Sequence, residues 1–450
     1  MRRLLTFLCC FLLAYPASAV NLKELRELYW RGYTPLIAPN FQQIVLPASG
    51  TTAQFGAVLS PGIAASTLNA TKKTPIYYPG TVYKFVFGLN PNSTAGSVTA
   101  TLYKNTTAEL SCSITTSSSN YQQCEATGTT SFTVSTSDTL SVGFTTTQTS
   151  WASDLTQISF LFQPAQDQHA NIFAGTSGST TWNSGTTPSY IGPQVAGFSS
   201  TESTANVWMP TSGWITGFTV NLSGNDGSSP NNHTYYMCHN AASGACTSSS
   251  LTCSTNGNTT CTTSATAAPI YVSPTDTISI EVVGGSGSAP ALGGNFAIGW
   301  IPATAGQYPL FMAPATNSTN TFYLALMGNN LVTSDESYWS MFPHATTISL
   351  SNLYAFNFNA NSSTHTRAWN LRTATFAASP SPTDGSLSCT ASATSTSAQG
   401  GGGNLTGISC KNTTFTQLAP ILGWGEIKQV STNGAASGGQ KVSVVSVIKQ

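Results

Sequence analysis

Charged residues are scarce in this chain of 450 residues: only 7% are Asp, Glu, Lys or Arg, and 15 basic residues balance 15 acidic ones. The stretch 105–366 contains no lysine or arginine at all. Proteins that bind nucleic acid need clustered cations to replace phosphate counterions, so the composition argues against a nucleic-acid partner. The same stretch offers no cleavage site to trypsin-like proteases, which suits a protein that persists outside cells.

Long apolar runs are missing as well, except at the N-terminus. Residues 1–19 combine Arg2 and Arg3, the apolar run 4–13 and the sequence Ala17-Ser18-Ala19, which together are typical of a secretory signal peptide. Beyond residue 19, no run approaches the roughly 20 apolar residues of a membrane-spanning helix. We therefore expect a secreted protein without a transmembrane segment, located extracellularly or at the cell surface.

Catalytic patterns are also missing. The chain has no Gly-x-Ser-x-Gly elbow, and its carboxylates are scattered. Asp335 and Glu336 are adjacent, so on a strand they would point to opposite faces. The sequence therefore predicts a protein without enzymatic activity and without a cofactor. A glycoside hydrolase or lyase on a β scaffold is the third alternative, and it would need two carboxylates facing one cleft.

Eight cysteines remain once the predicted signal peptide is removed, and they fall into close pairs. In an exported chain, an even number of paired cysteines indicates disulfides, although sequence alone does not fix which cysteines are joined. The expected neighbouring pairs are Cys112 with Cys124, Cys238 with Cys246, Cys253 with Cys261, and Cys389 with Cys410.

A zinc site is the alternative for part of this set, because His233 and His239 lie near Cys238 and Cys246. The Cys-x2-Cys spacing of zinc sites is absent, so export favours a disulfide and we predict no metal.

One passage of sequence recurs three times. Each copy has a Leu-Ser/Thr-Cys strand, a second cysteine and a closing apolar strand, and the copies begin at Leu110, Leu251 and Leu387. Asp138 in the first copy and Asp276 in the second lie 138 residues apart, so these copies share one register. We interpret both aspartates as turn formers, since Asp followed by Thr bonds its own backbone, rather than as metal or catalytic carboxylates. Self-similarity at this scale predicts three domains.

The first strong strand of each copy alternates apolar and polar residues with period two, which is typical of an antiparallel sheet with one buried face. The sets expected to share a face are Tyr83, Phe85, Phe87 and Leu89; Trp214, Phe218, Val220 and Leu222; and Ile348, Leu350, Tyr354, Phe356 and Phe358. Many short strands separated by turn signals predict an all-β fold of three tandem antiparallel β-sandwich or jelly-roll domains with disulfide-clamped hairpins.

The expected organisation is a signal peptide over 1–19, a leader with a short amphipathic helix over 20–40, and β domains over 41–164, 165–302 and 303–450. The leader lies outside the repeats and is therefore free to contact something else.

Surface features supply two further sets of candidates. Trp151 and Trp182 sit in Ser/Thr/Gly-rich loops, where each ring could stack on a sugar or pack against a neighbouring domain. Trp208, Trp214 and Trp300 fall on strand patterns and are expected in cores. Asn-x-Ser/Thr sequons could accept glycans, although a chain rich in these residues also generates sequons by chance. They are at Asn69, Asn92, Asn105, Asn221, Asn232, Asn258, Asn317, Asn361, Asn404 and Asn412.

Taken together, the tandem strand-rich repeats, the signal peptide and the cation-poor faces resemble the jelly-roll or sandwich subunits of bacterial extracellular fibrils and surface adhesins. The Asp-Thr turn phrase with its paired cysteines is also similar to repeats in phage tail proteins. The fibril resemblance implies self-association into a homo-oligomer or fibre. In pilin-type fibrils a terminal segment of one subunit completes a neighbour's sheet, and here Phe41–Pro47 is the candidate donor. The leading prediction is a structural subunit of a fibre or surface layer, and the alternative is a glycan-binding adhesin.

Overall fold

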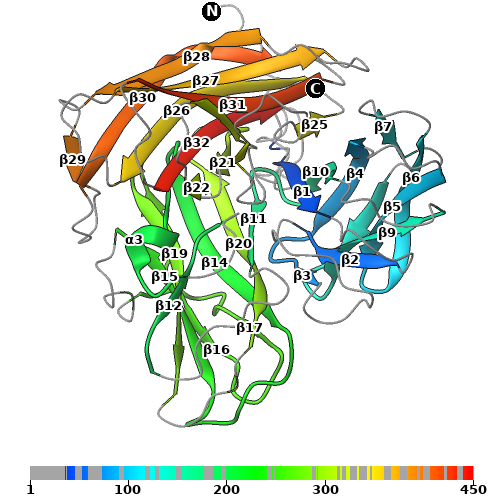
Figure 1. The fold of residues 1–450 in the computed structure, drawn as a ribbon. Coiled ribbons are helices and arrows are strands. Elements are labelled where there is room, and N and C mark those ends of the chain that lie inside the picture. The colour runs from blue at the N-terminus through cyan, green and yellow to red at the C-terminus, as the bar shows by residue number, and fades with distance from the viewer. Residues whose placement is uncertain are drawn as a thin grey trace, which may run out of the picture. The chain divides into compact units, whose positions relative to one another are not determined.

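The computed structural model of the chain is built almost entirely from antiparallel strands (Figure 1). Every strand pair within the described residues is antiparallel. The one helix in this part of the chain is α3 (Glu202–Ala205). The all-β fold class predicted from the sequence is therefore confirmed.

The structure describes residues 36, 38–45, 53–58, 73–90, 96–116, 122–126, 131–147, 155–175, 186–193, 199–240, 246, 249–285, 290, 292–311, 315–316, 321–324, 332–333, 342–344, 347–358, 366–375, 383–392, 396–398, 406–419, 423–432 and 439–448. Residues Leu36–Gln450 form one compact unit. The predicted signal peptide and leader helix lie outside the described residues. No helix within these ranges is long and apolar enough to cross a membrane.

The first two sheets are formed by strands between residues 38 and 164. One sheet has the order β1 (Ala38–Val45), β10 (Leu155–Pro164), β4 (Gly80–Asn90) and β7 (Gln122–Glu125), with β8 (Ser131–Val134) also paired to β4. The other has the order β2 (Gln54–Ala57), β9 (Thr139–Thr146), β5 (Gly96–Lys104) and β6 (Thr107–Thr116), with β3 (Thr74–Pro75) also paired to β9. Phe87 of β4 packs on Phe144 of β9 with ring centroids 5.9 Å apart, so the sheets face each other.

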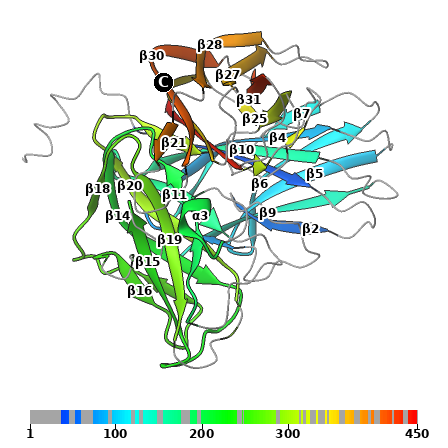
Figure 2. The ribbon, with the colours of Figure 1, turned by 60° about the vertical axis from the view of Figure 1, so that its left-hand side comes forward.

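The next two sheets repeat this plan between residues 170 and 302 (Figure 2). One has the order β11 (Ala170–Gly175), β20 (Gly294–Pro302), β14 (Gly213–Leu222) and β17 (Thr260–Thr262), with β18 (Ile270–Val272) paired to β14. The other has the order β12 (Ser189–Ile191), β19 (Thr277–Gly284), β15 (His233–His239) and β16 (Thr252–Ser254), with β13 (Val207–Trp208) paired to β19.

The last two sheets lie between residues 308 and 448. One has the order β21 (Tyr308–Phe311), β32 (Gly439–Ile448), β26 (Ile348–Phe358), β30 (Thr406–Ala419) and β29 (Thr396–Ala398), with β22 (Ala315–Thr316) paired to β32. The other has the order β24 (Val332–Thr333), β23 (Thr321–Leu324), β31 (Gly423–Thr432), β27 (Thr366–Thr375) and β28 (Thr383–Ser392), with β25 (Phe342–His344) paired to β31.

All three sheet pairs share one topology. Short strands that pair with the same neighbour, such as β2 with β3 and β7 with β8, can be taken as one interrupted strand. Each sheet pair then contains a set of eight strands, and when these are numbered in chain order, their spatial order is 1-8-3-6 in one sheet and 2-7-4-5 in the other. Two four-stranded sheets connected in this way form a jelly roll. The chain is therefore a tandem of three jelly rolls, which we call the first, second and third jelly rolls.

A β-bulge interrupts the third strand of every jelly roll. In each jelly roll, the pairing register of the third strand with the last strand shifts at one point. In the first, this point lies in β4 opposite Ser159 and Leu161 of β10; in the second it lies between Ile215 and Gly217 of β14; in the third it lies between Ser351 and Tyr354 of β26, at Asn352. A bulge adds a residue to one strand, so the side chains beyond it exchange faces. Lys84 and Asn352, with φ of 57° and 53°, mark two of these positions.

The bulges overturn part of the expected alternation. The core side of β14 is formed by Ile215, Phe218, Val220 and Leu222, each fully buried, whereas Trp214 is 38% exposed. The assignment of Trp214 to a core is therefore wrong. In β26, Leu353 and Ala355 lie in the main hydrophobic core. Tyr354 and Phe356, which were expected to share the core face, therefore lie on the opposite face of the strand. Trp300 is fully buried as expected.

The four expected disulfides are present: Cys112–Cys124, Cys238–Cys246, Cys253–Cys261 and Cys389–Cys410. Three of them join the fifth strand of a jelly roll to its sixth strand, and these strands lie in facing sheets. Each of these bonds therefore connects the two layers of a sandwich, rather than two hydrogen-bonded strands of one hairpin.

Strand β1 occupies the edge position next to β10, with Phe41 opposite Ser159 and Val45 opposite Leu155. The described part of the candidate donor segment, Phe41–Val45, thus belongs to the first strand of its own jelly roll. The expectation that this segment serves as a donor for a neighbour is not met in this structure.

Candidate functional site

The two repeating aspartates fold their own turns. Asp276 accepts hydrogen bonds from the Ser273 backbone N–H at 2.7 Å and from the Asn240 side-chain amide at 2.7 Å. Asn240 in turn accepts from the Thr277 backbone N–H at 2.8 Å. Burial opposes ionisation of Asp276, but the bonds from Asn240, His239 and Ser273 outweigh it and hold the pKa of its carboxyl below the usual value.

The first jelly roll repeats this arrangement with Asp138, Ser135, Asn105 and Thr139. Burial again opposes ionisation, and hydrogen bonds from Ser135 and Asn105 again leave the pKa of Asp138 lowered. The arrangement joins the turn after the fourth strand to the start of the seventh. These carboxylates are therefore structural, as the Asp-Thr pattern indicated.

The residues considered for zinc do not converge on one site. His239 Nε2 lies 2.9 Å from Asp276 Oδ2, whereas His233 Nδ1 lies 2.9 Å from Asp226 Oδ1. Cys238 and Cys246 are bonded to each other, so neither sulfur is a free thiolate, although a carboxylate oxygen of Glu281 lies within 4.8 Å of both sulfurs.

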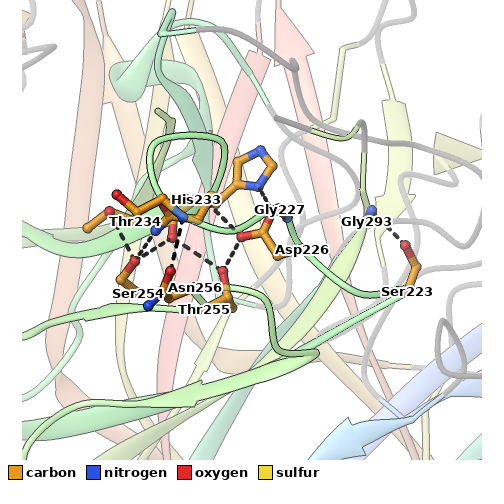
Figure 3. A network of polar contacts seen from close by, with 11 residues as sticks. Ser223, Asp226, Gly227, His233, Thr234, Ser254, Thr255, Asn256 and Gly293 are labelled. Atoms are coloured by element: carbon orange, nitrogen blue, oxygen red, sulfur yellow. Dashed lines mark hydrogen bonds and ion pairs between the residues drawn. The ribbon is translucent and has the colours of Figure 1, made fainter. Parts of the chain in front are cut away.

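Figure 3 shows the polar network around Asp226, which the sequence did not single out. Its carboxylate accepts from the His233 backbone N–H at 2.6 Å, from the Gly227 N–H at 2.9 Å and from the Thr255 hydroxyl. Asp226 is 5% exposed and His233 is fully buried. A histidine paired with an aspartate suggests catalysis, but a substrate cannot reach this imidazole, so the network holds the loop before β15 onto β15 and β16.

Two buried carboxylates influence each other electrostatically. Glu202 of α3 and Glu281 of β19 are 1% and 0% exposed, and the charge of Glu281 contributes to a raised pKa of Glu202, whose main cause is burial. Burial likewise raises the pKa of Glu281, which accepts a hydrogen bond from Tyr190 Oη at 3.2 Å. A glycosidase needs its carboxylates in a cleft that admits a sugar, so this pair does not fit one.

The outer face of one sheet of the second jelly roll is buried where it meets the first jelly roll. Phe173 on β11 and Ala297 on β20 point away from their own core, since they alternate with the inward-facing Ile172 and Ile298, yet both are fully buried. Segment Lys73–Tyr78, which includes β3, contacts this face, because the Lys73 carbonyl accepts hydrogen bonds from Asn221 Nδ2 at 3.0 Å and from Asn295 Nδ2 at 3.2 Å. We call this contact the first junction.

Direct bonds fix the first junction. Asn171 Oδ1 accepts from the backbone N–H groups of Tyr77 and Tyr78 at 3.1 and 2.8 Å, and its Nδ2 donates to the Tyr78 carbonyl at 3.0 Å. The Tyr78 hydroxyl lies 2.5 Å from Thr216 Oγ1. Burial raises the pKa of Tyr78 to about 12, so this hydroxyl stays protonated. The ring of Tyr77 lies against Gly299, where a β-carbon would be only 2.5 Å from Tyr77 Cε1.

A second junction joins the second and third jelly rolls. Trp208 of β13 packs on Phe356 of β26 with ring centroids 4.9 Å apart, and Tyr354 belongs to the same buried cluster. Trp208 is 8% exposed. It is thus buried as expected, but in a contact between jelly rolls rather than in the core of one. Lys441 of β32 enters the same region and donates a 2.5 Å hydrogen bond to the Ser203 carbonyl.

The sequons divide by their surroundings. Asn221 is 7% exposed, and its Nδ2, the atom that would carry a glycan, donates to the Lys73 carbonyl in the first junction. Asn258 is exposed, and Asn105, Asn232 and Asn412 are half-buried. Asn69, Asn92, Asn317, Asn361 and Asn404 lie outside the described residues, as do Trp151 and Trp182.

Exposed aromatic side chains are nevertheless present among the described residues. Trp214 of β14 and Tyr271 of β18 are 38% and 48% exposed, and their rings pack edge to face 5.2 Å apart. The residues stand opposite each other in the register of these two strands. They form an aromatic platform, and the sequence could not reveal it because the bulge at Gly217 decides which way Trp214 points.

No protein-family model and no curated protein matches the chain. Among solved structures, the empty top-component particles of cowpea mosaic virus share 9% identity over 61% of this chain and 91% of theirs, with a TM-score of 0.20. The VP2 subviral particle of infectious bursal disease virus shares 11% sequence identity over 86% of this chain and 74% of its own, with a TM-score of 0.15. The triple jelly roll of an archaeal virus turret shares 10% sequence identity over 95% of this chain and 93% of its own, with a TM-score of 0.14. At such scores these likenesses carry no argument, and the jelly-roll assignment rests on strand order.

Proposed function

We propose that this chain is a secreted, non-enzymatic structural protein that self-associates into an extracellular fibre or surface layer. The first junction is the observation that carries the proposal. A sheet face whose outward residues Asn171, Phe173 and Ala297 are all fully buried is a packed interface, and such an interface restricts relative motion of the two jelly rolls. Restricted motion suits a building block, which must present its contact surfaces in a constant arrangement.

Two further properties support this role. Three disulfides connect the two sheets of a jelly roll, and bonds of this kind typically add about 2–4 kcal/mol of stability. Jelly rolls also build shells: the fold is common in capsid proteins, where repeated domains pack side by side.

Electron microscopy of the mature protein in negative stain, over a range of concentrations, tests the proposal. We expect ordered filaments or sheets that appear as concentration rises, and light scattering should report the same growth in mass. Monodisperse monomers at every concentration would refute the proposal.

The aromatic platform favours a second candidate function, that of a glycan-binding adhesin. Exposed Trp and Tyr rings present flat apolar faces beside polar edges, and jelly rolls are also the fold of many lectins. On a glycan array we expect binding by the wild type and loss of binding in Trp214→Ala. Phe415→Ala is the matched control, because Phe415 is 53% exposed elsewhere on the surface. Trp151→Ala and Trp182→Ala test the two loop tryptophans in the same way, and an array without signal for the wild type removes this candidate.

A further inference from the structure

Three polar side chains meet in the buried second junction. Lys441 comes from β32, the last strand of the third jelly roll, whereas Asn206 and Glu202 come from the C-cap and the first residue of α3 in the second jelly roll. Lys441 is 3% exposed, Glu202 is 1% exposed and Asn206 is fully buried. Burying an amine, an amide and a carboxyl is costly unless they contact one another, so this grouping needs a physical reason.

The contacts give each group a distinct place. Lys441 Nζ donates a hydrogen bond to Asn206 Oδ1, which puts the amine against the carbonyl side of the amide. The opposite side of the amide faces the carboxyl, because Asn206 Nδ2 lies 3.0 and 3.1 Å from the two oxygens of Glu202. Ser279 Oγ donates to Glu202 Oε1 at 3.0 Å and so orients the carboxyl. An amine, an amide and a carboxyl therefore lie in sequence.

The surroundings favour the uncharged forms of both ionisable groups. Burial lowers the pKa of Lys441, and the neighbouring Glu202 charge opposes this only in part. Burial raises the pKa of Glu202. The hydrogen bonds from Asn206 and Ser279 and the charge of Lys441 oppose this only in part, and the charge of Glu281 adds to it. Both shifts are toward the uncharged forms, the neutral amine of Lys441 and the neutral carboxylic acid of Glu202. A neutral lysine amine is a nucleophile, and a carboxylic acid is a proton donor.

From this geometry we propose that Lys441 and Asn206 form an intramolecular isopeptide bond, with Glu202 as the catalytic acid and base. Lys441 Nζ attacks Asn206 Cγ, and the C=O π pair moves to Oδ1. Glu202 gives its proton to the leaving Nδ2 and takes one back from Nζ. As the carbonyl re-forms, the Cγ–Nδ2 bond breaks and Nδ2 departs as ammonia. One amide replaces another, so no oxidant, reductant or further reactant is needed.

The bond would have a clear structural consequence. It would link β32 to the segment after α3, two parts of the chain 235 residues apart, across the second junction. The disulfides of this chain act within single jelly rolls, whereas this bond would join two of them and would also resist reducing agents. Holding the amine and the amide together in a dry site supplies the proximity on which such a reaction depends.

Mass spectrometry of the reduced, mature wild-type protein tests the proposal directly. We expect an intact mass lower than the sequence mass by one ammonia molecule. Trypsin should fail to cleave after Lys441, because an amidated lysine is not a substrate. The peptide 429–449 should then remain attached to the peptide 105–367, and a second protease should reduce this pair to a short branched peptide that contains Asn206 and Lys441.

Variants assign the roles. Lys441→Arg and Asn206→Ala should each restore the full mass, and Glu202→Gln should restore it wholly or slow the loss of ammonia by orders of magnitude. Lys428→Arg is the matched control, because Lys428 faces Asp384 at 3.7 Å elsewhere in the third jelly roll and its replacement should leave the ammonia loss unchanged.

Mass spectrometry of the wild-type protein tests the proposal even if one of the variants fails to fold. If the intact mass equals the sequence mass and trypsin cleaves normally after Lys441, the proposal is overturned, and Lys441 and Asn206 form only a buried non-covalent contact. A loss of ammonia without the branched peptide also overturns it, since cyclisation elsewhere would then be its source.

Discussion

The first junction makes a prediction about Gly299, which lies under the ring of Tyr77. A β-carbon built on Gly299 would lie 2.5 Å from Tyr77 Cε1 and 2.4 Å from Thr216 Oγ1, closer than real β-carbons approach other atoms. Gly299→Ala should therefore force the Tyr77 ring away from β20. Overpacking of this kind costs about 1–3 kcal/mol.

The assay is thermal unfolding followed by calorimetry, with Gly224→Ala as the matched control. A β-carbon at Gly224 would meet only Leu292 at an ordinary 3.5 Å, so this variant should unfold like the wild type. Gly299→Ala should lower the transition temperature by several degrees, because about 1 kcal/mol corresponds to a few degrees in domains of this size.

A double-mutant cycle then attributes the cost to the junction. Tyr77→Ala removes the ring that the new methyl group meets, so Gly299→Ala should cost less in that background, with an interaction energy of about 0.5–3 kcal/mol. Equal costs in both backgrounds would show that the clash with Thr216 Oγ1 inside the second jelly roll, and not the Tyr77 ring, sets the cost, which would contradict its attribution to the first junction. The same conclusion would follow if Gly299→Ala and Gly224→Ala unfolded at the same temperature.

Three further predictions concern other parts of the fold. Cys253→Ser together with Cys261→Ser should lower the free energy of unfolding by about 2–4 kcal/mol, and thiol titration of the denatured, unreduced wild-type mature chain should find no free thiol; a free thiol would contradict the pairing. The folded-state pKa of Asp276 is depressed, so its stabilisation is complete above its unfolded pKa of about 3.9 and is lost as the pH falls through the lower folded value. Melting temperatures between pH 6 and 2 should therefore fall less steeply in Asp276→Asn than in the wild type, and equal slopes would argue against the turn bonds. If the chain is expressed in a glycosylating host, peptide mapping should find Asn258 modified and Asn221 unmodified, whereas a glycan on Asn221 would contradict the buried first junction.

Local patterns predicted some structural features well. Neighbouring cysteines with short separations formed the expected pairs, because chain proximity limits which sulfurs can meet. The Asp-Thr pattern indicated the turns at Asp138 and Asp276, since the carboxylate bonds a backbone N–H only three residues away.

The alternation of apolar residues was misleading where a bulge intervened. Trp214 and Phe356 continue the apolar pattern of their strands, yet one is exposed and the other lies in the second junction. A bulge is a property of the paired strands, because it arises from the match between β14 and β20 or between β26 and β32. The residues of one strand alone do not show how that strand pairs with its neighbour, so they do not show where the bulge lies.

By itself, the sequence determined the features that depend on near neighbours: strands rather than helices, repetition, paired cysteines and turns. Only the tertiary structure decided which strands share a sheet, which faces the junctions bury, and that Lys441 meets Asn206 and Glu202. The contact between Lys441 and Asn206 joins residues 235 positions apart. Nothing in the chemistry of a lone lysine in β32 or a lone asparagine after α3 indicates its partner, because burial and contact arise only when separate jelly rolls pack together.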